Sequence, residues 1–159
     1  MKATYIAAAL AAAFSMSASF SILAGECPAD KRVADGQGQK NPGHGPKAVT
    51  DVVITSTDLG NEKVGLKEHQ FRARRLVIQP GGIVPWHSHD ERPAMIYVVK
   101  GEIYEYASNC IAPILHKVGD VARESKGTSH WWQNTGKAAV ELISVDILAP
   151  QMKHDEKMM

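Results

Sequence analysis

Apolar residues in this chain come in short runs, and polar turn-forming residues separate them. The runs are rich in Val, Ile, Tyr and Phe, which strands favour, and none keeps a helical period of apolar positions over several turns. Clusters such as "DLGNEKVG" and "QPGG" lie between the runs and predict turns. The pattern predicts an all-β domain over residues 48–148, built as a sandwich or a small antiparallel barrel. The runs are residues 48–55, 70–78, 94–99, 102–107, 112–118 and 138–148.

The first 24 residues have the composition of a secretory signal peptide. Lys2 precedes a long stretch rich in Ala and Ser, and small residues follow near Ala24. An uncleaved membrane anchor is the alternative, but Ala and Ser make a weaker span than Leu or Ile. We therefore expect cleavage near Ala24 and export to the periplasm or the medium. Residues 25–47 and 149–159 are expected to form a flexible leader and a flexible tail, because they lack apolar periodicity.

Composition narrows the fold and the partners. A chain of 159 residues with 44% hydrophobic residues has material for one modest core, so a single domain is expected. The formal net charge is +1, and the charged residues are scattered along the chain. No basic block is present that would bind nucleic acid or anionic lipid, so we expect neither partner, and no membrane attachment after signal removal.

The chain has two cysteines, Cys27 and Cys110. In an exported protein both would meet an oxidising compartment with no third thiol to compete, which makes a disulfide between them a candidate. Two unpaired thiols are the alternative. The sequence alone does not decide between a disulfide and two unpaired thiols. A disulfide requires the two Cα atoms to lie close together in space, and the separation in sequence does not show this.

Three histidines are candidate metal ligands. His87 and His89 are two residues apart in "PWHSHD", and side chains two apart on a strand point to the same face. His130 lies in another strand-like stretch, "GTSHWWQN". Each of these has an ordinary explanation when taken alone. His87 and His89 could be a chance pair at the surface, and His130 could be a partly buried histidine without a metal.

The two stretches together resemble the paired motifs of the cupin superfamily. The first motif has the form G-x5-H-x-H-x3-4-E-x6-G, and the second has the form G-x5-P-x-G-x2-H-x3-N. The resemblance spans roughly Ala48 to Leu148, nearly the whole predicted domain. The first motif is matched by Gly81, His87, His89 and Gly101. The second motif is matched by Gly119, Gly127, His130 and Asn134.

This resemblance implies a small type-2 cupin barrel, a double-stranded β-helix of jelly-roll type. It also implies a metal ion near the barrel axis, held by His87, His89 and His130, with a ligand pocket around it. Many cupins are dimers, so a homodimer is implied as well.

Two positions depart from the motifs. Ser125 replaces the proline of the second motif, which affects turn stiffness. Ala94 stands where the family places a metal-binding glutamate. Three outcomes stay open: a three-histidine centre with positions left for water or substrate, a centre in which Glu91 substitutes as an oxygen ligand, and a barrel that has lost its metal.

Charge predicts the class of ligand, and the compartment favours certain metals. Three neutral imidazoles leave the full charge of a divalent ion uncancelled, which favours an anionic chelating molecule such as a carboxylate or enolate. The start "MKATY" has no twin-arginine pair, so we expect the metal to be acquired outside the cytoplasm. There the Irving–Williams order favours zinc or copper, while iron, manganese and nickel stay as alternatives.

Other side chains are candidates for substrate contacts. Arg72 and Arg74 are two apart on one expected strand and could clamp a carboxylate, although paired arginines on a strand usually face water. Tyr97, Tyr104 and Trp132 are further candidates, and barrel packing is the alternative for each. The sequence leaves two candidate functions. The first is a metalloenzyme that acts on a small anion by oxygenation, isomerisation, hydrolysis or lyase chemistry. The second is a non-catalytic module that binds or senses a small molecule or the metal.

Overall fold

Eight strands make up nearly all the regular structure of residues 25–150, the part of the chain that the computed structural model describes. The expected all-β class is therefore confirmed, while the residues expected to form a signal peptide (1–24) and the tail from residue 151 lie outside the described residues. A 3-10 turn, η1 (Ala29–Lys31), precedes the strands. The strands are β1 (Lys47–Asp58), β2 (Gln70–Ser88), β3 (Ala94–Lys100), β4 (Glu102–Ala107), β5 (Ile114–Lys117), β6 (Val121–Glu124), β7 (Ser129–Gln133) and β8 (Val140–Leu148).

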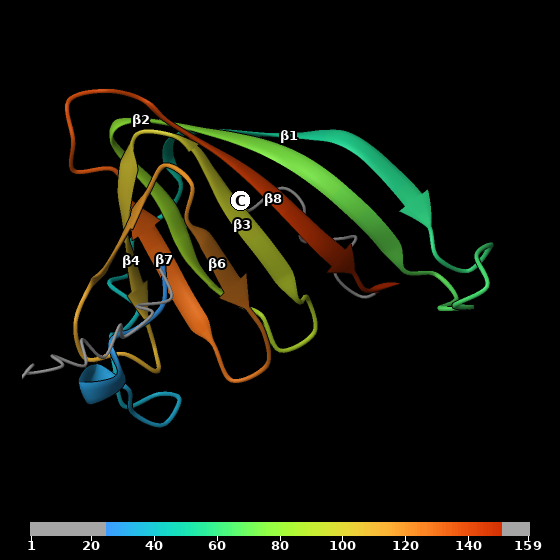
Figure 1. Cartoon of the computed structure of the whole chain (residues 1–159), viewed down its shortest axis with the longest axis horizontal. Helices are drawn as coiled ribbons and strands as arrows, with labels where there is room; N and C mark the ends of the chain where they lie inside the picture. The colour runs from blue at the N-terminus through green and yellow to red at the C-terminus, as the bar shows by residue number, and fades with distance from the viewer. Residues whose placement is uncertain (1–24, 151–159) are drawn as a thin grey trace, which may run out of the picture.

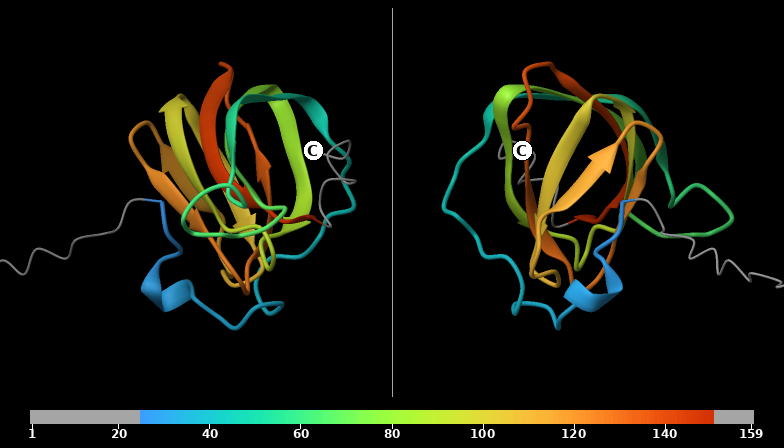
Figure 2. Two further views of the ribbon diagram at one scale, coloured as in Figure 1. Left: turned by 90° about the vertical axis from the view of Figure 1, so that its right-hand side faces the viewer. Right: turned by 60° about the vertical axis from the view of Figure 1, so that its left-hand side comes forward.

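The strands form one antiparallel sheet that curls into a nearly closed barrel (Figures 1 and 2). Their order is β5-β4-β7-β2-β8-β3-β6, and β1 pairs with β2 outside this path. Several neighbours in the sheet are far apart in sequence, since β2 pairs with both β7 and β8 and β3 pairs with β8. Because of this strand order, strands from both halves of the sequence surround one common interior.

The sequence predicted a turn at "QPGG" that would end a strand. This prediction is wrong. β2 continues through this stretch, pairing with β8 over residues 70–78 and with β7 over residues 83–88. Gly81 has a φ of 73°, a left-handed value that glycine adopts without strain, so the strand bends here instead of reversing. One strand thus carries both the arginines of its first half and His87 near its end.

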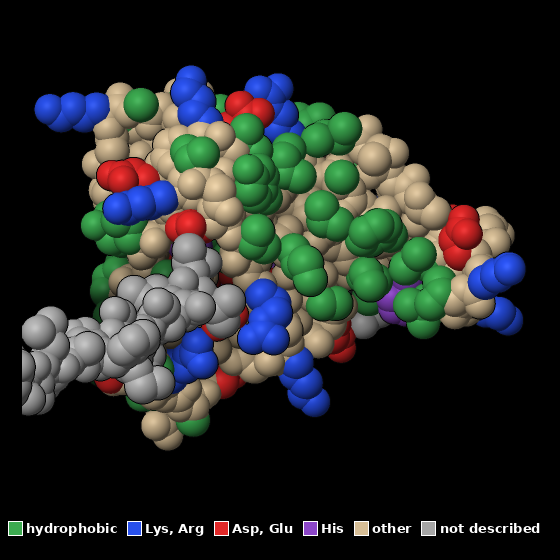
Figure 3. Space-filling view, in the orientation of Figure 1, with side chains coloured by type: hydrophobic (Ala, Val, Ile, Leu, Met, Phe, Trp, Pro, Cys, Tyr) green, Lys and Arg blue, Asp and Glu red, His purple; other side chains and the backbone are tan. Residues whose placement is uncertain are grey.

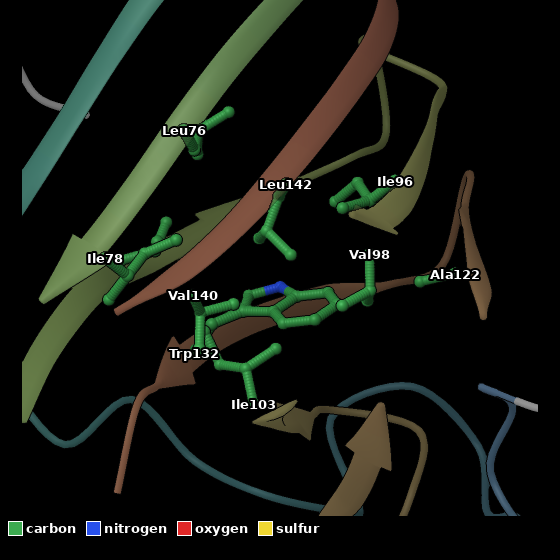
Figure 4. Packing of buried hydrophobic residues seen from close by; sticks show 10 residues of the cluster. Leu76, Ile78, Ile96, Val98, Ile103, Ala122, Trp132, Val140 and Leu142 are labelled. Atoms are coloured by element: carbon green, nitrogen blue, oxygen red, sulfur yellow. The ribbon is translucent and has the colours of Figure 1, made fainter. Parts of the chain in front are cut away.

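The core follows from the alternation of each strand. Along β8 every second residue is buried, and β3 and β4 show the same period of two. Trp132 is 1% exposed and lies among the aliphatic side chains of this core (Figure 4). The cluster comprises Leu76, Ile78, Val84, Ile96, Val98, Ile103, Ala122, Trp132, Val140 and Leu142.

Most of β1 is exposed to solvent. Every residue of β1 from Val52 to Asp58 is exposed, and in Figure 1 this part of β1 lies at the edge of the sheet, beside the start of β2, which pairs with β8 on its other side. Hydrophobic side chains also gather on the outer face of the sheet in Figure 3. On β3 the exposed apolar residues are Met95, Tyr97 and Val99.

The segment expected to be a flexible leader contains η1 but no strand before residue 47, and it is attached to the barrel. Cys27 and Cys110 form a disulfide with Cα atoms 5.8 Å apart. Arg32 pairs with Cys110 as an isolated β-bridge. Gly38 packs so closely that a Cβ there would lie 2.5 Å from the backbone nitrogen of Cys110. Within residues 25–150, no helix has the length and apolar character needed to cross a membrane.

Candidate metal centre

The three motif histidines meet inside the barrel. His87 lies near the end of β2, directly opposite His130 of β7, and His89 follows just after β2 ends. Their Nε2 atoms form a triangle with sides of 3.0 Å (His87 to His89), 2.9 Å (His89 to His130) and 3.1 Å (His87 to His130). His89 and His130 are buried and His87 is half-buried. The ligand atoms of all three could therefore reach one ion.

The other ring nitrogen of each histidine has an acceptor. A carbonyl or a carboxylate oxygen only accepts, so each Nδ1 carries the proton and each Nε2 presents a lone pair to the centre of the triangle. Three lone pairs this close repel one another unless a cation lies between them, so the donor set fits a metal ion. For His87, His89 and His130 in turn, the acceptors are the Pro85 carbonyl at 2.8 Å, the Arg92 carbonyl at 2.7 Å and the Glu105 carboxylate at 2.8 Å.

The electrostatics of the three rings differ. Burial, followed by repulsion from His130, holds the pKa of His87 well below its ordinary value and lowers the pKa of His89 to about 3. Burial also opposes protonation of His130, but Glu124 and Glu105 outweigh it and raise the pKa of that ring. The two carboxylates thus favour positive charge at His130, which either a proton or a metal ion at Nε2 supplies.

A second group of ligand atoms adjoins His130. Glu105 and Glu124 are buried, and their oxygens lie 2.8 and 3.4 Å from His130 Nδ1. The other oxygen of Glu105 is 2.8 Å from Nε2 of buried His116. Burial raises the pKa of Glu124, whereas at Glu105 the hydrogen bonds from His116 and His130 outweigh burial and lower the pKa.

Glu105, Glu124 and His116 were not predicted as site residues from the sequence. The turn before β3 hides the parity of β4, and the pairing of β6 with β3 is a long-range feature. In that pairing Glu124 lies opposite Ala94, the position where the motif has its glutamate. The signal that was available is the alternation of Ile103, Glu105 and Ala107, which are all buried. Glu91 is exposed and belongs to neither group of ligand atoms.

A small cavity of about 20 Å³ is lined in part by His87 and His89, and Arg74 and Ser144 are also among its walls. The Arg74 guanidinium is paired with Asp51 and lies 3.3 Å from Asp146, but its Nε has no hydrogen-bond partner among the described residues. Space of this size holds about one water molecule. A ligand entering here must therefore be very small or must displace side chains.

The structure separates the remaining candidates for substrate contacts. Arg72 is absent from the cavity wall and binds Asp146 through two hydrogen bonds of 3.0 and 2.9 Å. Tyr97 is 44% exposed on the outer face, and Tyr104 is half-buried with its ring 6.5 Å from that of Tyr106. Neither tyrosine lines the cavity, but Trp132 does.

Comparison with known proteins finds the same family as the two motifs. Residues 74–146 match the family model described as "Cupin domain". An oxalate-binding protein of Thermotoga maritima is 34% identical over 74 residues, which are 46% of this chain and 60% of that protein. A germin-like protein (subfamily 2 member 2) of Arabidopsis thaliana is 29% identical over 87 residues, 52% of this chain and 40% of that protein. The chain thus spans less than two thirds of either relative.

Solved structures share the fold. A predicted oxalate decarboxylase from Thermotoga maritima superposes with a TM-score of 0.54 at 23% identity, covering 77% of this chain and 98% of that one. A cupin domain from Schizosaccharomyces pombe gives a TM-score of 0.52 at 13% identity, covering 74% and 78%. At these identities the likeness concerns the barrel and not its chemistry.

Proposed function

We propose that this chain, which belongs to the cupin superfamily as a small type-2 cupin, is an exported protein that holds one divalent metal ion and binds a small carboxylate-type anion. The metal ligands are His87, His89 and His130. The observation that carries the proposal is the convergence of three Nε2 lone pairs within 3.1 Å of one another in the barrel interior. Protonation at Nδ1 satisfies each of the three Nδ1 contacts, and it leaves Nε2 of each ring available to the ion.

The anionic class of the ligand is supported by charge and by the cavity wall. The histidines bring no negative charge, and Ala94 stands in place of the motif glutamate. Arg74 adds a guanidinium with an unpartnered Nε at the same cavity, and Ser144 adds a hydroxyl. The small size of the cavity favours the smallest carboxylates. The relative and one of the similar solved structures, both from Thermotoga maritima, are named for oxalate binding and predicted oxalate decarboxylation. These names are consistent with oxalate as the first ligand to test.

When bound, the ion would supply Lewis-acid chemistry, or dioxygen chemistry if it is iron. We propose zinc or copper, because an all-imidazole site loaded outside the cytoplasm favours these ions; iron, manganese and nickel are the alternatives. The signal-like composition of residues 1–24 supports export. The chain's own contribution is to hold three rings in one tautomer, to exclude water and to orient the anion through Arg74.

A non-catalytic binding module is the second candidate function. Turnover needs a proton-transfer group at the cavity, and the walls of the small cavity contain no carboxylate, thiol or tyrosine. Glu105 and Glu124 lie instead on the Nδ1 side of His130. This arrangement favours binding of an anion over acid-base chemistry upon it.

Metal content and anion binding test the proposal together. The full chain, expressed with its own first 24 residues and purified without added metal, should contain close to one equivalent of a single metal by elemental mass spectrometry. His130→Ala should lose it, whereas His44→Ala, at an exposed histidine outside both clusters, should keep it. Calorimetry with oxalate should show binding to the loaded protein alone. An empty wild-type protein that binds oxalate equally well would overturn the metal-dependent scheme.

A further inference from the structure

A second cavity, of about 240 Å³, lies on the Nδ1 side of His130. Glu105 and Glu124 are part of its wall, and the attached N-terminal segment supplies Gly25, Glu26 and Cys27. The metal centre plays no part in this cavity's lining, since none of the three histidines contributes to it. The start of the described chain therefore lies beside the carboxylates that support the metal ligand.

His116 presents an unsatisfied nitrogen near this wall. The ring is fully buried, stacks on Trp132 with centroids 4.5 Å apart, and directs Nε2 at Glu105. Because the carboxylate of Glu105 accepts, the proton of His116 lies on Nε2 and Nδ1 is left as an acceptor. That Nδ1 is buried and has no hydrogen-bond partner among the described residues. A buried acceptor without a donor is costly, so a donor is expected here.

Gly25 lies next to this acceptor. A substituent placed on its Cα in the position of a Cβ would be 2.9 Å from His116 Nδ1 and 3.3 Å from the carbonyl oxygen of Val121. These distances are too short for comfortable contact of a carbon with Nδ1, but they suit a nitrogen that donates hydrogen bonds. The position has the character of an ammonium site with two acceptors.

We propose that the α-ammonium group of Gly25, freed by cleavage after Ala24, occupies this position and donates to His116 Nδ1 and the Val121 carbonyl. Once Ala24 is gone, rotation about the Cα–C bond of Gly25 exchanges the amino nitrogen with the Cβ-like position. While Ala24 is attached, the nitrogen must continue the chain. This inference rests on the export that forms part of the proposed function.

The neighbouring residues hold Gly25 in place for this contact. Cys27 is joined to Cys110 by the disulfide, and Arg32 donates from Nε to the Cys27 carbonyl at 3.0 Å. Arg32 also pairs with Glu26 at 2.7 Å. The free chain end thus has only two residues between its nitrogen and a covalent anchor. Its ammonium would fix the tautomer of His116 and, through Glu105, support the orientation of His130.

The test begins with the full chain carrying its own first 24 residues, exported by a bacterium. N-terminal sequencing and intact mass should show a mature chain that starts at Gly25. Its α-amine should react with an amine-specific reagent about tenfold more slowly than that of a chain that retains Ala24, the effect of one net hydrogen bond. Nitrogen NMR of His116 should show Nδ1 as a hydrogen-bonded acceptor only in the chain that starts at Gly25.

Two controls keep the outcomes apart. His116→Phe should restore fast labelling of the Gly25 amine, and circular dichroism will show whether this variant folds; the NMR comparison needs no variant of the core. This inference alone would be overturned if the α-amines of the two chains were labelled at equal rates and the NMR signal of His116 Nδ1 were the same in both. A chain that keeps residues 1–24, or is cut elsewhere, would overturn it together with the export. Metal content on the same samples tests the metal proposal separately.

Discussion

Glu105 of β4 accepts a hydrogen bond from His130 Nδ1 of β7 across 2.8 Å, and its other oxygen accepts one from His116. The carboxylate therefore lies between a metal-ligand ring and a second, fully buried imidazole. A carboxylate behind a ligand histidine fixes its tautomer and raises its basicity. Of the three candidate ligands, His130 is the one whose acceptor carries a charge.

Glu105→Gln should weaken metal binding. The amide can still accept from His130 Nδ1, but the negative charge is lost, so metal affinity should fall about 10- to 100-fold. A zinc titration against a competing chelator measures this. Glu102→Gln, at an exposed position of the same strand, is the matched control and should bind as tightly as the wild type. Equal affinities for both variants would show that Glu105 does not support the centre.

Arg74→Lys should weaken binding of a small carboxylate while leaving metal content unchanged. Lysine keeps the positive charge near Asp51 and Asp146 but lacks the planar fork of Arg74, including the Nε that has no hydrogen-bond partner among the described residues. The loss should be about tenfold in Kd for oxalate, measured by calorimetry, as expected for one charge-assisted hydrogen bond. Arg75→Lys changes the next residue, whose side chain pairs with Glu141 at the surface, and should leave Kd unaltered.

Removal of the disulfide should lower stability. Cys27 and Cys110 are 83 residues apart in sequence, and a link across a loop of this length stabilises a fold by about 2–4 kcal/mol. The double variant Cys27→Ser/Cys110→Ser should lose this amount of unfolding free energy in urea. Reductant should destabilise the wild type to the same extent and leave the double variant unaffected. A wild type indifferent to reductant would show that the link is absent or without effect.

Asp146→Asn should be strongly destabilising. Asp146 is buried, is held by Arg72 in two hydrogen bonds, and has Arg74 at 3.3 Å and Arg92 at 3.9 Å. Loss of its charge leaves these guanidinium groups with less compensation, at a cost of about 3–5 kcal/mol. Chemical denaturation measures the change. The surface variant Glu141→Gln breaks an ion pair with Arg75 at the surface and should change stability far less than Asp146→Asn does.

Local patterns were sufficient for the all-β class, whereas the barrel and the joint role of the three histidines followed from the resemblance to the cupin motifs. Alternation along the chain predicted the strand class, and the spacing of two motifs singled out the three histidines that the fold brings together. The long strand β2 was missed because Gly81 bends a strand here, whereas a Gly-Gly pair more often marks a reversal. Glu124 was missed because its place opposite Ala94 depends on the pairing of β6 with β3, which no local pattern records.

The arginines show the same limit of local reasoning. Their spacing correctly placed Arg72 and Arg74 on one face of a strand, and that face is buried. Which acids meet them is a matter of register between β2, β1 and β8, where Arg72 faces Asp146 directly. The sharing of one face could be predicted, but the burial of that face and the acids that meet it could not.

Trp132 stands between the aliphatic core and the histidines, with its ring centroid 5.6 Å from that of His130. Its light emission should therefore depend on what the histidines hold. Zinc has a filled d shell and no redox chemistry, so it would leave this emission largely intact, while copper would quench it. The barrel thus contains its own optical indicator of the metal, readable in a cuvette without a label or a mutation.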